Sequence, residues 1–458
     1  MAGKRYDAIL IGTGQAAPAL AGRLSGAGMK IAIAERGLFG GTCVNTGCIP
    51  TKTLVASAAA AETVRRASRY GVVAAPPAID MKAVKARKDE ISGSSRTSVE
   101  KTLRELRNAT VYTEHARFES PDEVRVGDEL LTADKIFLNV GGRAITESIK
   151  GAGETPHWTN SSIMAVDFVP PHLVVVGGSY VGLEFAQMYR RFGSAVTVVE
   201  MSDRLVARED AEISTEIRSI LEREGIAIRT GAKCIAVEKG PSGVRVGVDC
   251  QDGSPVVDGT HLLLAVGRRP NTDDLGLDRA GVAVDARGYV QVDDQLRTST
   301  PGIWALGDCN GKGAFTHTSY NDFEIVAANL LDGDSRRVSD RIEAYALYVD
   351  PPLGRCGMTE TAAAKSGRRI LVGKRHMARV GRAIEKGETQ GLMKIVVDAD
   401  SKQILGAAIL GVGGDEVIHA VLDVMYARAP YTVLQRAMHI HPTVAEYLPT
   451  ILGELKAP

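Results

Sequence analysis

The chain has 458 residues, of which 44% are hydrophobic and 24% are charged, so it is long enough for about three globular domains. Fifty-five basic and fifty-five acidic residues cancel, so no overall field favours nucleic acid or an anionic membrane as a partner. No run approaches the ~20 apolar residues that span a bilayer, and six scattered cysteines do not form a secreted disulfide framework. We therefore expect a cytoplasmic protein.

The N-terminal segment has the pattern of a βαβ unit that binds a dinucleotide. A short apolar strand at Tyr6–Ile11 leads into a glycine turn, a helix rich in Ala and Leu, and a second strand at Lys30–Ala34. Glycines let the backbone approach a pyrophosphate at the positive end of the helix, and an acid after the second strand bonds a ribose hydroxyl. The residues with these roles are Gly12, Gly14, Ala17 (in place of the last glycine) and Glu35.

Two cysteines follow this unit closely. Cys43 and Cys48 are separated by four residues, and Lys52 comes shortly after them. The spacing alone is a weak signal, because metal sites use similar ones. In a chain expected in a reducing compartment, a close pair next to a dinucleotide fingerprint indicates a catalytic redox disulfide rather than a structural one, and we expect no metal site.

The same unit occurs a second time. A strand at Leu173–Val176 leads into Gly177, Ser179 (in place of the middle glycine) and Gly182, then into a helix through Tyr189 and a strand at Ala195–Val199 that ends at Glu200. The first glycine and the acid are 23 residues apart in both copies. One such match is weak evidence, but two at matched spacing predict two Rossmann-like domains.

The remaining segments suggest where the domains end. Residues 80–107 are a charged, helix-favouring stretch with Ser and Gly breaks, which indicates a solvated face. Residues 151–171 are rich in loop formers, and from about residue 344 no fingerprint recurs: strands at Met393–Val397 and Ile404–Leu410 alternate with helices. We predict an α/β protein with two dinucleotide-binding domains and an α+β C-terminal domain, divided as 1–150, 151–270, 271–343 (returning to the first domain) and 344–458.

These motifs resemble those of the FAD-dependent pyridine nucleotide–disulfide oxidoreductases, the family of dihydrolipoamide dehydrogenase, glutathione reductase and mercuric reductase. Nearly the whole chain takes part, and five motifs in the right order make the resemblance specific. In chain order they are Gly12-x-Gly14-x-x-Ala17, Gly41-Thr42-Cys43-x4-Cys48-x-Pro50-x-Lys52, Gly177-x-Ser179-x-x-Gly182-x-Glu184, Gly307-Asp308 and His441-Pro442-Thr443-x-x-Glu446.

The resemblance implies FAD in the first domain, NAD(P)H in the second, and a homodimer whose C-terminal domains share the active sites. The positions expected to bind FAD are Gly12, Gly14, Ala17, Glu35, Gly41, Thr42, Lys52, Gly142, Asp308 and His317. Those expected to bind the nicotinamide nucleotide are Gly177, Ser179, Tyr180, Gly182, Glu200 and Gly267. For His317 a structural role and a flavin contact both stay open.

The resemblance also assigns the chemistry. Cys48 would lie against the flavin, and Cys43 would attack the substrate. A thiolate is the reactive form of cysteine, so a base is needed, and His441 of the partner subunit fits that need with Glu446 orienting it. Lys52 and Glu184 resemble the pair that meets near flavin N5, and Tyr180 occupies the position where some relatives cover the empty nicotinamide pocket.

The end of the second fingerprint bears on the choice of nucleotide. Glu200 would bond the 2′-hydroxyl of NADH and repel a 2′-phosphate. Enzymes that use NADPH need arginines just beyond this point, and Arg204 is the only early candidate. We expect NADH, with NADPH less favoured.

The substrate is less defined than the reaction. The chain ends without the vicinal cysteines of mercuric reductases and keeps His441, which a metal ion does not need. Segments 48–55 and 350–355 resemble the branch of the bacterial reactive-chlorine resistance flavoprotein, which is associated with copper reduction. We predict an NADH-dependent reductase of a small disulfide. The alternatives are a reductase of Cu(II) or Hg(II), a dihydrolipoamide dehydrogenase, and a redox-inert complex subunit. The other cysteines are expected to be inert: Cys234, Cys250, Cys309 and Cys356.

Overall fold

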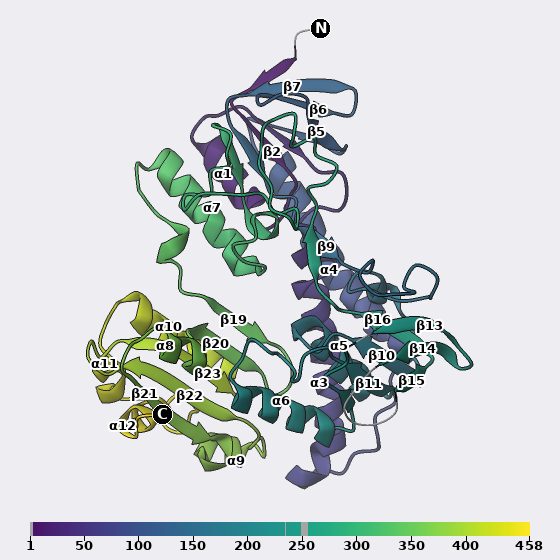
Figure 1. The fold of residues 1–458 in the computed structure, drawn as a ribbon, viewed down its shortest axis with the longest axis vertical. Coiled ribbons are helices and arrows are strands. Elements are labelled where there is room, and N and C mark those ends of the chain that lie inside the picture. Colours follow the sequence, from purple (N-terminus) through teal and green to yellow (C-terminus); the bar gives the residue numbers. More distant parts are fainter. Residues whose placement is uncertain (1–2, 234, 249–254) are drawn as a thin grey trace.

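The computed structural model describes residues 3–233, 235–248 and 255–458, so Cys234 and Cys250 lie outside the described residues. Three lobes surround a central seam, with the N-terminus at the far end of the upper lobe and the C-terminus in the lower left lobe (Figure 1). The mixed α/β fold class predicted above is confirmed. No helix within these described ranges is long and apolar enough to cross a membrane.

The upper lobe is built on a five-stranded parallel sheet in the order β18-β8-β2-β3-β4. Its strands are β2 (Ala8–Ile11), β3 (Ile31–Ala34), β4 (Ala109–Tyr112), β8 (Ile136–Leu138) and β18 (Ile303–Ala305). Strand β18 comes from far along the chain, so two separate segments complete one sheet. The helices α1 (Ala17–Gly26) and α7 (Thr316–Leu331) pack together beside it (Figure 1).

The first strand differs from its prediction. Tyr6–Ile11 is not one strand, because Asp7 interrupts it and its carboxylate accepts a hydrogen bond from the Lys30 amide at 2.7 Å. The part before Asp7 joins a different sheet, in the order β1-β7-β6-β5. These strands are β1 (Lys4–Tyr6), β5 (Ala116–Phe118), β6 (Glu123–Val126) and β7 (Glu129–Ala133).

Long helices connect the upper lobe to the rest of the molecule. The cysteine segment forms α2 (Gly41–Asn45) and α3 (Cys48–Arg66), followed by η1 (Ala67–Tyr70) and α4 (Met81–Arg104). The breaks expected in residues 80–107 do not occur. Asp80 caps α4 by accepting from the Ala83 amide at 3.0 Å, and packing against α3 holds its Ser- and Gly-containing middle in the helix.

The lower right lobe carries the second fingerprint on a parallel sheet in the order β12-β11-β10-β16. The strands are β10 (His172–Val176), β11 (Ala195–Val199), β12 (Ala227–Arg229) and β16 (His261–Leu264), with α5 (Tyr180–Phe192) and α6 (Ala211–Arg223). An antiparallel sheet covers one side, made of β13 (Ala236–Gly240), β14 (Gly243–Gly247) and β15 (Val256–Gly259). The chain enters through β9 (Gly142–Ala144) and returns through β17 (Arg268–Pro270), and these two strands pair antiparallel.

The lower left lobe is an antiparallel sheet in the order β19-β20-β23-β22-β21 with short helices around it. The strands are β19 (Ala344–Leu347), β20 (Leu353–Gly357), β21 (Ile370–His376), β22 (Leu392–Asp398) and β23 (Ile404–Leu410). The helices are α8 (Glu360–Lys365), α9 (Gly381–Glu385), α10 (Gly414–Tyr426), α11 (Thr432–Arg436) and α12 (Tyr447–Gly453). The α+β character is as predicted, but β22 and β23 follow each other as a hairpin with no helix between them.

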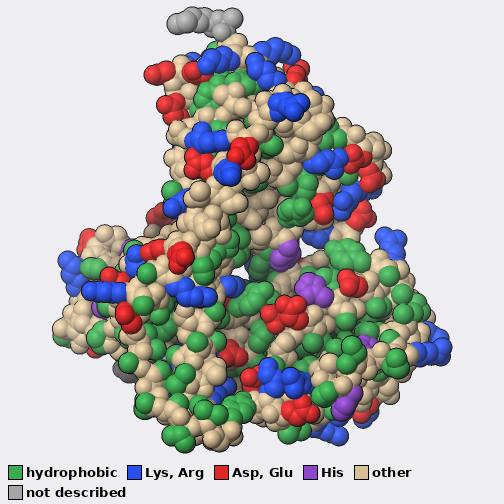
Figure 2. Space-filling view, turned by 180° about the vertical axis from the view of Figure 1, so that it is seen from behind, with side chains coloured by type: hydrophobic (Ala, Val, Ile, Leu, Met, Phe, Trp, Pro, Cys, Tyr) green, Lys and Arg blue, Asp and Glu red, His purple; other side chains and the backbone are tan. Residues whose placement is uncertain are grey.

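Four single-turn 3₁₀ helices complete the described elements: η2 (Ser162–Ala165), η3 (Gly307–Asn310), η4 (Val338–Asp340) and η5 (Met377–Arg379). Seen from behind, the surface is hollowed near the middle, between the upper lobe and the lower ones (Figure 2). Charges of both signs are interspersed on this face, which matches the cancelling totals of the sequence.

Candidate active site

A cavity of about 870 Å³ lies where the three lobes meet. It begins at the carboxyl ends of β2 and β3, where open parallel sheets bind their ligands, and continues past the cysteine segment and the start of α7 toward β19. It brings together many predicted site residues from both fingerprints: Gly12, Gly14, Glu35, Gly41, Thr42, Cys43, Cys48, Lys52, Tyr180, Glu184, Asp308 and His317.

The first two positions of the first fingerprint accept only glycine. Gly12 has φ +88°, and a Cβ there would lie 2.5 Å from the Asn139 carbonyl oxygen. A Cβ at Gly14 would lie 2.6 Å from Asn139 Oδ1. The backbone therefore stays open at the positive end of α1, which Ala17 begins. This arrangement fits the pyrophosphate of FAD.

Glu35 is held at the end of β3 by the same turn. Its carboxylate accepts from the Thr13 amide at 2.9 Å, from the Thr13 hydroxyl at 2.7 Å and from the Gly37 amide at 2.8 Å. A fixed carboxylate beside the cradle suits a ribose hydroxyl.

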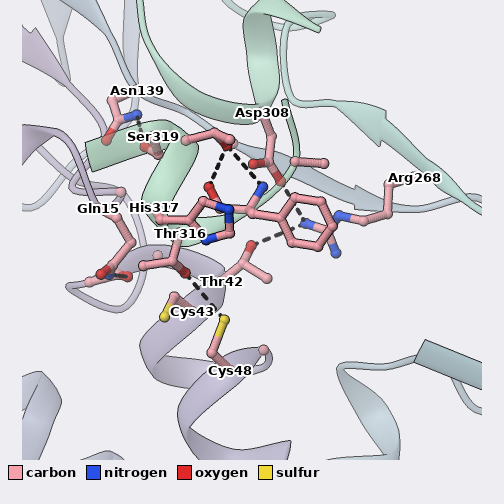
Figure 3. A pocket seen from close by; sticks show the side chains of 18 of the residues that line it. Gln15, Thr42, Cys43, Cys48, Asn139, Arg268, Asp308, Thr316, His317 and Ser319 are labelled. Atoms are coloured by element: carbon pink, nitrogen blue, oxygen red, sulfur yellow. Dashed lines mark hydrogen bonds and ion pairs between the residues drawn. The ribbon is translucent and has the colours of Figure 1, made fainter. Parts of the chain in front are cut away.

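The two cysteines lie next to each other although they belong to different helices. Cys43 sits in α2, Cys48 is the first residue of α3, and both are free thiols. A Cβ at Gly47 would lie 2.8 Å from the Thr42 carbonyl oxygen, so glycine permits the tight turn between the helices. Figure 3 shows both sulfurs facing the cavity, with Cys48 Sγ 3.2 Å from the Thr316 hydroxyl.

The environment makes the two thiols unequal. A hydrogen bond from Cys43, supported by Thr316 and by the charge of Lys52, lowers the pKa of Cys48 to about 6 although burial opposes the change. The same hydrogen bond, together with burial, raises the pKa of Cys43 above its usual value. Cys48 is therefore the thiol of the pair that ionises more readily.

Lys52 extends from α3 toward the second fingerprint helix. Its Nζ lies 2.7 Å from Glu184 Oε2 and 4.5 Å from the ring centre of Tyr348. The other oxygen of Glu184 accepts from the Tyr348 amide at 3.0 Å. The Glu184 side chain is 6% exposed and the Lys52 side chain is 35% exposed, so the lysine is the partner that reaches into the cavity.

Asp308 lies at the opposite wall. Burial raises its pKa, while the charge of Arg268, whose Nη2 is 3.7 Å away, opposes the change. Arg268 also donates to the Thr42 hydroxyl at 3.2 Å, which links β17 to the cysteine segment (Figure 3). His317 Nε2 donates to the Ala344 carbonyl oxygen at 2.6 Å, and its ring stacks on Phe315.

The second fingerprint forms its own cradle at the start of α5. Gly177 has φ +116°, and a side chain there would overlap the Ala265 carbonyl, just as one at Gly182 would overlap the Gly177 carbonyl. Glu200 accepts from the Gly178 amide at 2.5 Å and from the Ser202 amide at 2.7 Å. Ser179 is the residue before the helix, and its side chain makes no capping bond. This cradle also fits a dinucleotide.

Gly142 and Gly267 lie at the crossing between the two lobes rather than in either cradle. A Cβ at Gly142 would lie 2.7 Å from the Arg269 carbonyl oxygen, so this glycine permits the close approach of β9 to β17. Gly267 has φ +130°.

His441 and Glu446 form a pair on the surface between α11 and α12. His441 Nδ1 lies 2.9 Å from Glu446 Oε2, and the histidine side chain is 80% exposed. His441 does not line the cavity of its own chain as the described residues form it.

Several residues that contact the predicted site residues could not be predicted from the sequence. Thr316 contacts Cys48, and Tyr348 contacts both Lys52 and Glu184. Asn139 accepts from the Ala17 amide at 3.2 Å and donates to the Leu306 carbonyl at 2.8 Å. None of these carries a motif spacing to the cysteines, although Asn139 follows an apolar strand, the position where such residues gather. Cys309 and Cys356 are buried, and burial raises the pKa of each to about 12.

The chain belongs to the pyridine nucleotide-disulphide oxidoreductase family, which residues 6–322 match, and residues 344–451 match the dimerisation domain of that family. It is a flavoprotein disulfide reductase of the class that uses FAD and NAD(P)H.

Three relatives are similar over nearly their whole lengths. The probable pyridine nucleotide-disulfide oxidoreductase RclA of Escherichia coli is 34% identical over 99% of this chain and 100% of its own. A dihydrolipoyl dehydrogenase of Thermus scotoductus (97% and 96% covered) and a mercuric reductase of Streptomyces lividans (97% and 94%) are each 33% identical. The solved Cu(II) complex of RclA superposes with a TM-score of 0.89 over 98% of this chain and 99% of that one.

Proposed function

We propose that this enzyme uses NADH to reduce a low-molecular-weight disulfide through FAD and the Cys43–Cys48 pair. The observation that carries this proposal is the unequal pair of thiols in the cavity. Both free thiols line one cavity and Cys48 lies 3.2 Å from the Thr316 hydroxyl, while the pKa of Cys48 is lowered and that of Cys43 is raised. Such an arrangement suits a pair in which one sulfur receives electrons and the other attacks a substrate.

FAD, when bound, supplies the chemistry of accepting hydride and passing an electron pair to a disulfide. The chain's own residues prepare that exchange. The Lys52 ammonium, fixed by Glu184, favours negative charge at the flavin end of the cavity and on Cys48. The positive N-terminus of α7, which begins at Thr316 next to Cys48, has the same effect.

The substrate disulfide would be reduced in two thiol–disulfide exchange steps. Cys43, deprotonated by a base, attacks one sulfur of the substrate disulfide, and a mixed disulfide forms while the first thiol leaves with a proton. The Cys48 thiolate attacks Cys43, which closes the Cys43–Cys48 disulfide and releases the second substrate thiolate, and this thiolate takes up a proton from solvent. One disulfide, one NADH and one proton give two thiols and NAD⁺.

The base we propose is His441 of the partner subunit. Because the pKa of Cys43 is raised, this thiol does not ionise unaided near neutral pH, and a base must take its proton and return it to the leaving thiol. The exposed His441–Glu446 pair lies in the segment that matches the dimerisation domain. A homodimer with shared active sites would bring the pair to the cysteines.

NADH is the proposed nucleotide. Glu200 is fixed by two backbone amides at the end of β11, where a carboxylate suits a ribose 2′-hydroxyl and repels a 2′-phosphate. The first arginine beyond it, Arg204, donates to the Ala207 carbonyl at 3.1 Å.

We place the enzyme in the cytoplasm. Outside the active pair, the structure describes two cysteines, Cys309 and Cys356, and both are free and buried. A reducing compartment keeps such thiols from forming disulfides.

Cu(II) is the second candidate substrate. The observation that favours it is the solved Cu(II) complex of RclA, a 34% identical relative. Two neighbouring thiols that open to one cavity could reduce two Cu(II) ions to Cu(I), the form that thiolates bind well, while the pair closes to a disulfide and releases its protons. Metal reduction would need no proton for a leaving thiol, so it would depend less on His441.

Replacing Cys43 tests the direction of electron flow. Cys43→Ser removes the attacking sulfur but keeps Cys48, so we expect reduction by NADH to persist and disulfide turnover to be lost. Stopped-flow reduction and steady-state assays with lipoamide, glutathione disulfide and other small disulfides measure the two halves separately. Undiminished turnover would remove Cys43 from this role.

Replacing His441 separates the two candidate substrates. We expect His441→Ala to slow disulfide reduction by about 10²–10⁴-fold, the usual effect of losing a general acid–base, and to slow Cu(II) reduction much less. His439→Ala is the matched control, because His439 lies two residues away and bonds only a backbone carbonyl. Equal losses with both substrates would contradict the proton-transfer role.

A further inference from the structure

Tyr180 is enclosed by aromatic rings where the nicotinamide would enter. Its ring meets Tyr345 edge-on with centres 5.4 Å apart, and Phe315 edge-on at 6.2 Å. Tyr345 and Phe315 are stacked at 5.5 Å. Tyr180 comes from the nucleotide lobe and Tyr345 from β19, so this contact closes the cavity across the seam between two lobes.

Tyr345 is fixed from behind by two buried charges. Its hydroxyl donates to Glu209 Oε1 at 2.7 Å, and Arg355 Nε lies 3.8 Å from Glu209 Oε2. Tyr345 and Arg355 are direct cross-strand neighbours on β19 and β20. The Glu209 side chain is fully buried and that of Arg355 is 2% exposed. We refer to Glu209, Tyr345 and Arg355 as the Glu209 cluster.

The segment that carries Glu209 is clamped to the lower left lobe. The neighbouring Asp210 accepts from Lys394 Nζ at 2.9 Å and from the amides of Glu360 and Thr361 at 3.0 and 3.1 Å. Glu209 therefore cannot follow a movement of Tyr180. Tyr345, bonded to Glu209, is a fixed wall.

Tyr180, in contrast, has no bond to a charged group or to the backbone within the described residues. Its hydroxyl is buried without a hydrogen-bond partner among the described residues, as are Oε2 of Glu209 and Nη2 of Arg355. Burying a charged pair without completing its hydrogen bonds is costly, and packing needs alone would be met by apolar side chains. The Glu209 cluster therefore costs free energy of folding, and it lies directly behind the Tyr345 ring that contacts Tyr180.

We propose that Glu209, Tyr345 and Arg355 are positioning residues that hold Tyr180 in its closed place and so set the affinity for the nicotinamide nucleotide. The inference rests on the proposed function, since it takes the space under Tyr180 as the nicotinamide pocket. A nucleotide that must displace Tyr180 binds with an apparent Kd equal to its intrinsic Kd divided by the open fraction. When Tyr345 is fixed more firmly by Glu209, the fraction of molecules in which Tyr180 is open falls.

The electrostatics agree with this geometry. Burial first, and then the charge of Glu209, raise the pKa of both Tyr180 and Tyr345. Both phenols therefore stay protonated, and the Tyr345 hydroxyl remains a donor to Glu209. Burial raises the pKa of Glu209 as well, while Arg355 and the bond from Tyr345 oppose the change.

Tyr345→Phe tests the proposal, because it keeps the stacked ring and removes the hydroxyl that bonds Glu209. We expect the Kd of a non-reducing NADH analogue for the oxidised enzyme, measured by calorimetry, to fall about threefold to tenfold. Glu209→Gln should act in the same direction, and adding Tyr345→Phe to it should change the Kd less than twofold, because both act through one bond.

The control is Tyr112→Phe, which removes a hydroxyl bonded to the Tyr6 hydroxyl at 2.8 Å and does not line the cavity. It should leave the Kd unchanged. General damage to the seam would weaken binding, so an unchanged or weaker affinity in Tyr345→Phe would overturn the inference while the proposed function stands. Wild-type enzyme that binds neither the NADH nor the NADPH analogue would overturn the proposed function and the inference together.

Discussion

The two dinucleotide units follow one backbone plan, with a glycine of positive φ, a helix and an acid 23 residues on, yet their surroundings differ. In the first unit Asn139 fills the space beside the glycines and bonds both the start of α1 and Leu306, the residue after β18. In the second, Ala265 takes the corresponding place and offers only its backbone carbonyl. The cradle positions a dinucleotide, and the residues around it decide what that dinucleotide can do.

The segments that come after the two units differ as well. After Glu35 the chain forms the cysteine segment, which places Cys43, Cys48 and Lys52 in the cavity. After Glu200 it forms the loop with Glu209 and Asp210, which joins the lower left lobe. In the account proposed above, the first unit would carry the thiol chemistry, and the second would bind the nicotinamide nucleotide, with access to its pocket set by the contact between Tyr180 and Tyr345.

The third fingerprint position should show the largest difference between the units. It is Ala17 in the first and Gly182 in the second, where a side chain would overlap the Gly177 carbonyl. We expect Gly182→Ala to lower the free energy of unfolding by about 1–3 kcal/mol and to slow reduction by NADH at least tenfold while FAD stays bound. Denaturant unfolding and stopped-flow reduction measure this.

Gly22→Ala is the matched control for that variant. Gly22 lies in α1, and a Cβ there meets nothing within 4 Å, so the substitution should be neutral or stabilise by up to about 1 kcal/mol. An undisturbed rate in Gly182→Ala would mean that the second cradle is not the nucleotide site.

Asn139 should matter for the first unit alone. Asn139→Ala removes the bond to the Leu306 carbonyl and one of the bonds that the Ala17 amide makes, which keeps its bond to the Gly14 carbonyl at 3.1 Å; the expected loss is about 1–3 kcal/mol. We expect weaker retention of FAD, measured as flavin released on dilution, with unchanged binding of the NADH analogue. Asn329→Ala, which breaks two bonds to the Arg336 backbone far from the cavity, should lower stability without releasing flavin. Equal flavin loss in both variants would contradict this account.

Glu200 gives a smaller effect. Glu200→Gln removes the charge that would repel a 2′-phosphate, and we expect the ratio of kcat/KM for NADPH over NADH to rise about fivefold, or about 1 kcal/mol. Glu35→Gln in the first unit should leave this ratio unchanged. A ratio that does not move in Glu200→Gln would remove the acid from nucleotide choice.

The smallest expected effect is on the pH at which the Cys48 thiolate, which follows the first unit, is lost. The lowered pKa of Cys48, about 6, means that its thiolate is present above that pH and is lost as the pH falls through it. We expect the long-wavelength absorbance of the reduced enzyme to fade below about pH 6. Lys52→Met removes a charge that lowers this pKa, so the midpoint should move upward. A midpoint that stays in place or moves downward would contradict the assignment.

Much of the fold could be predicted from local sequence pattern. Strands such as β11 and β23 have the bounds that their apolar runs predict, and the two fingerprints predicted the fold class. Prediction failed where tertiary contacts decide. The bond from the Lys30 amide to Asp7 splits one strand in two, and packing on α3 keeps α4 continuous through its Ser and Gly residues.

The site shows the same division. Motif residues such as Cys43 and Glu184 could be named because their motifs resemble those of a known family. Thr316 and Tyr348 could not, because they are far from Cys48 and Lys52 in the sequence and contact them only in the folded chain. The Glu209 cluster is of this second kind, since its members are spread over 146 residues between Glu209 and Arg355 and no local pattern marks them.

An anaerobic titration with NADH tests the central claim most directly, namely that electrons reach Cys48 and leave from Cys43. We predict that NADH produces the long-wavelength absorbance of a Cys48 thiolate facing oxidised flavin in the wild-type enzyme, and that Cys48→Ser abolishes it. Flavin reduction by NADH in the wild-type enzyme without that absorbance would contradict the account.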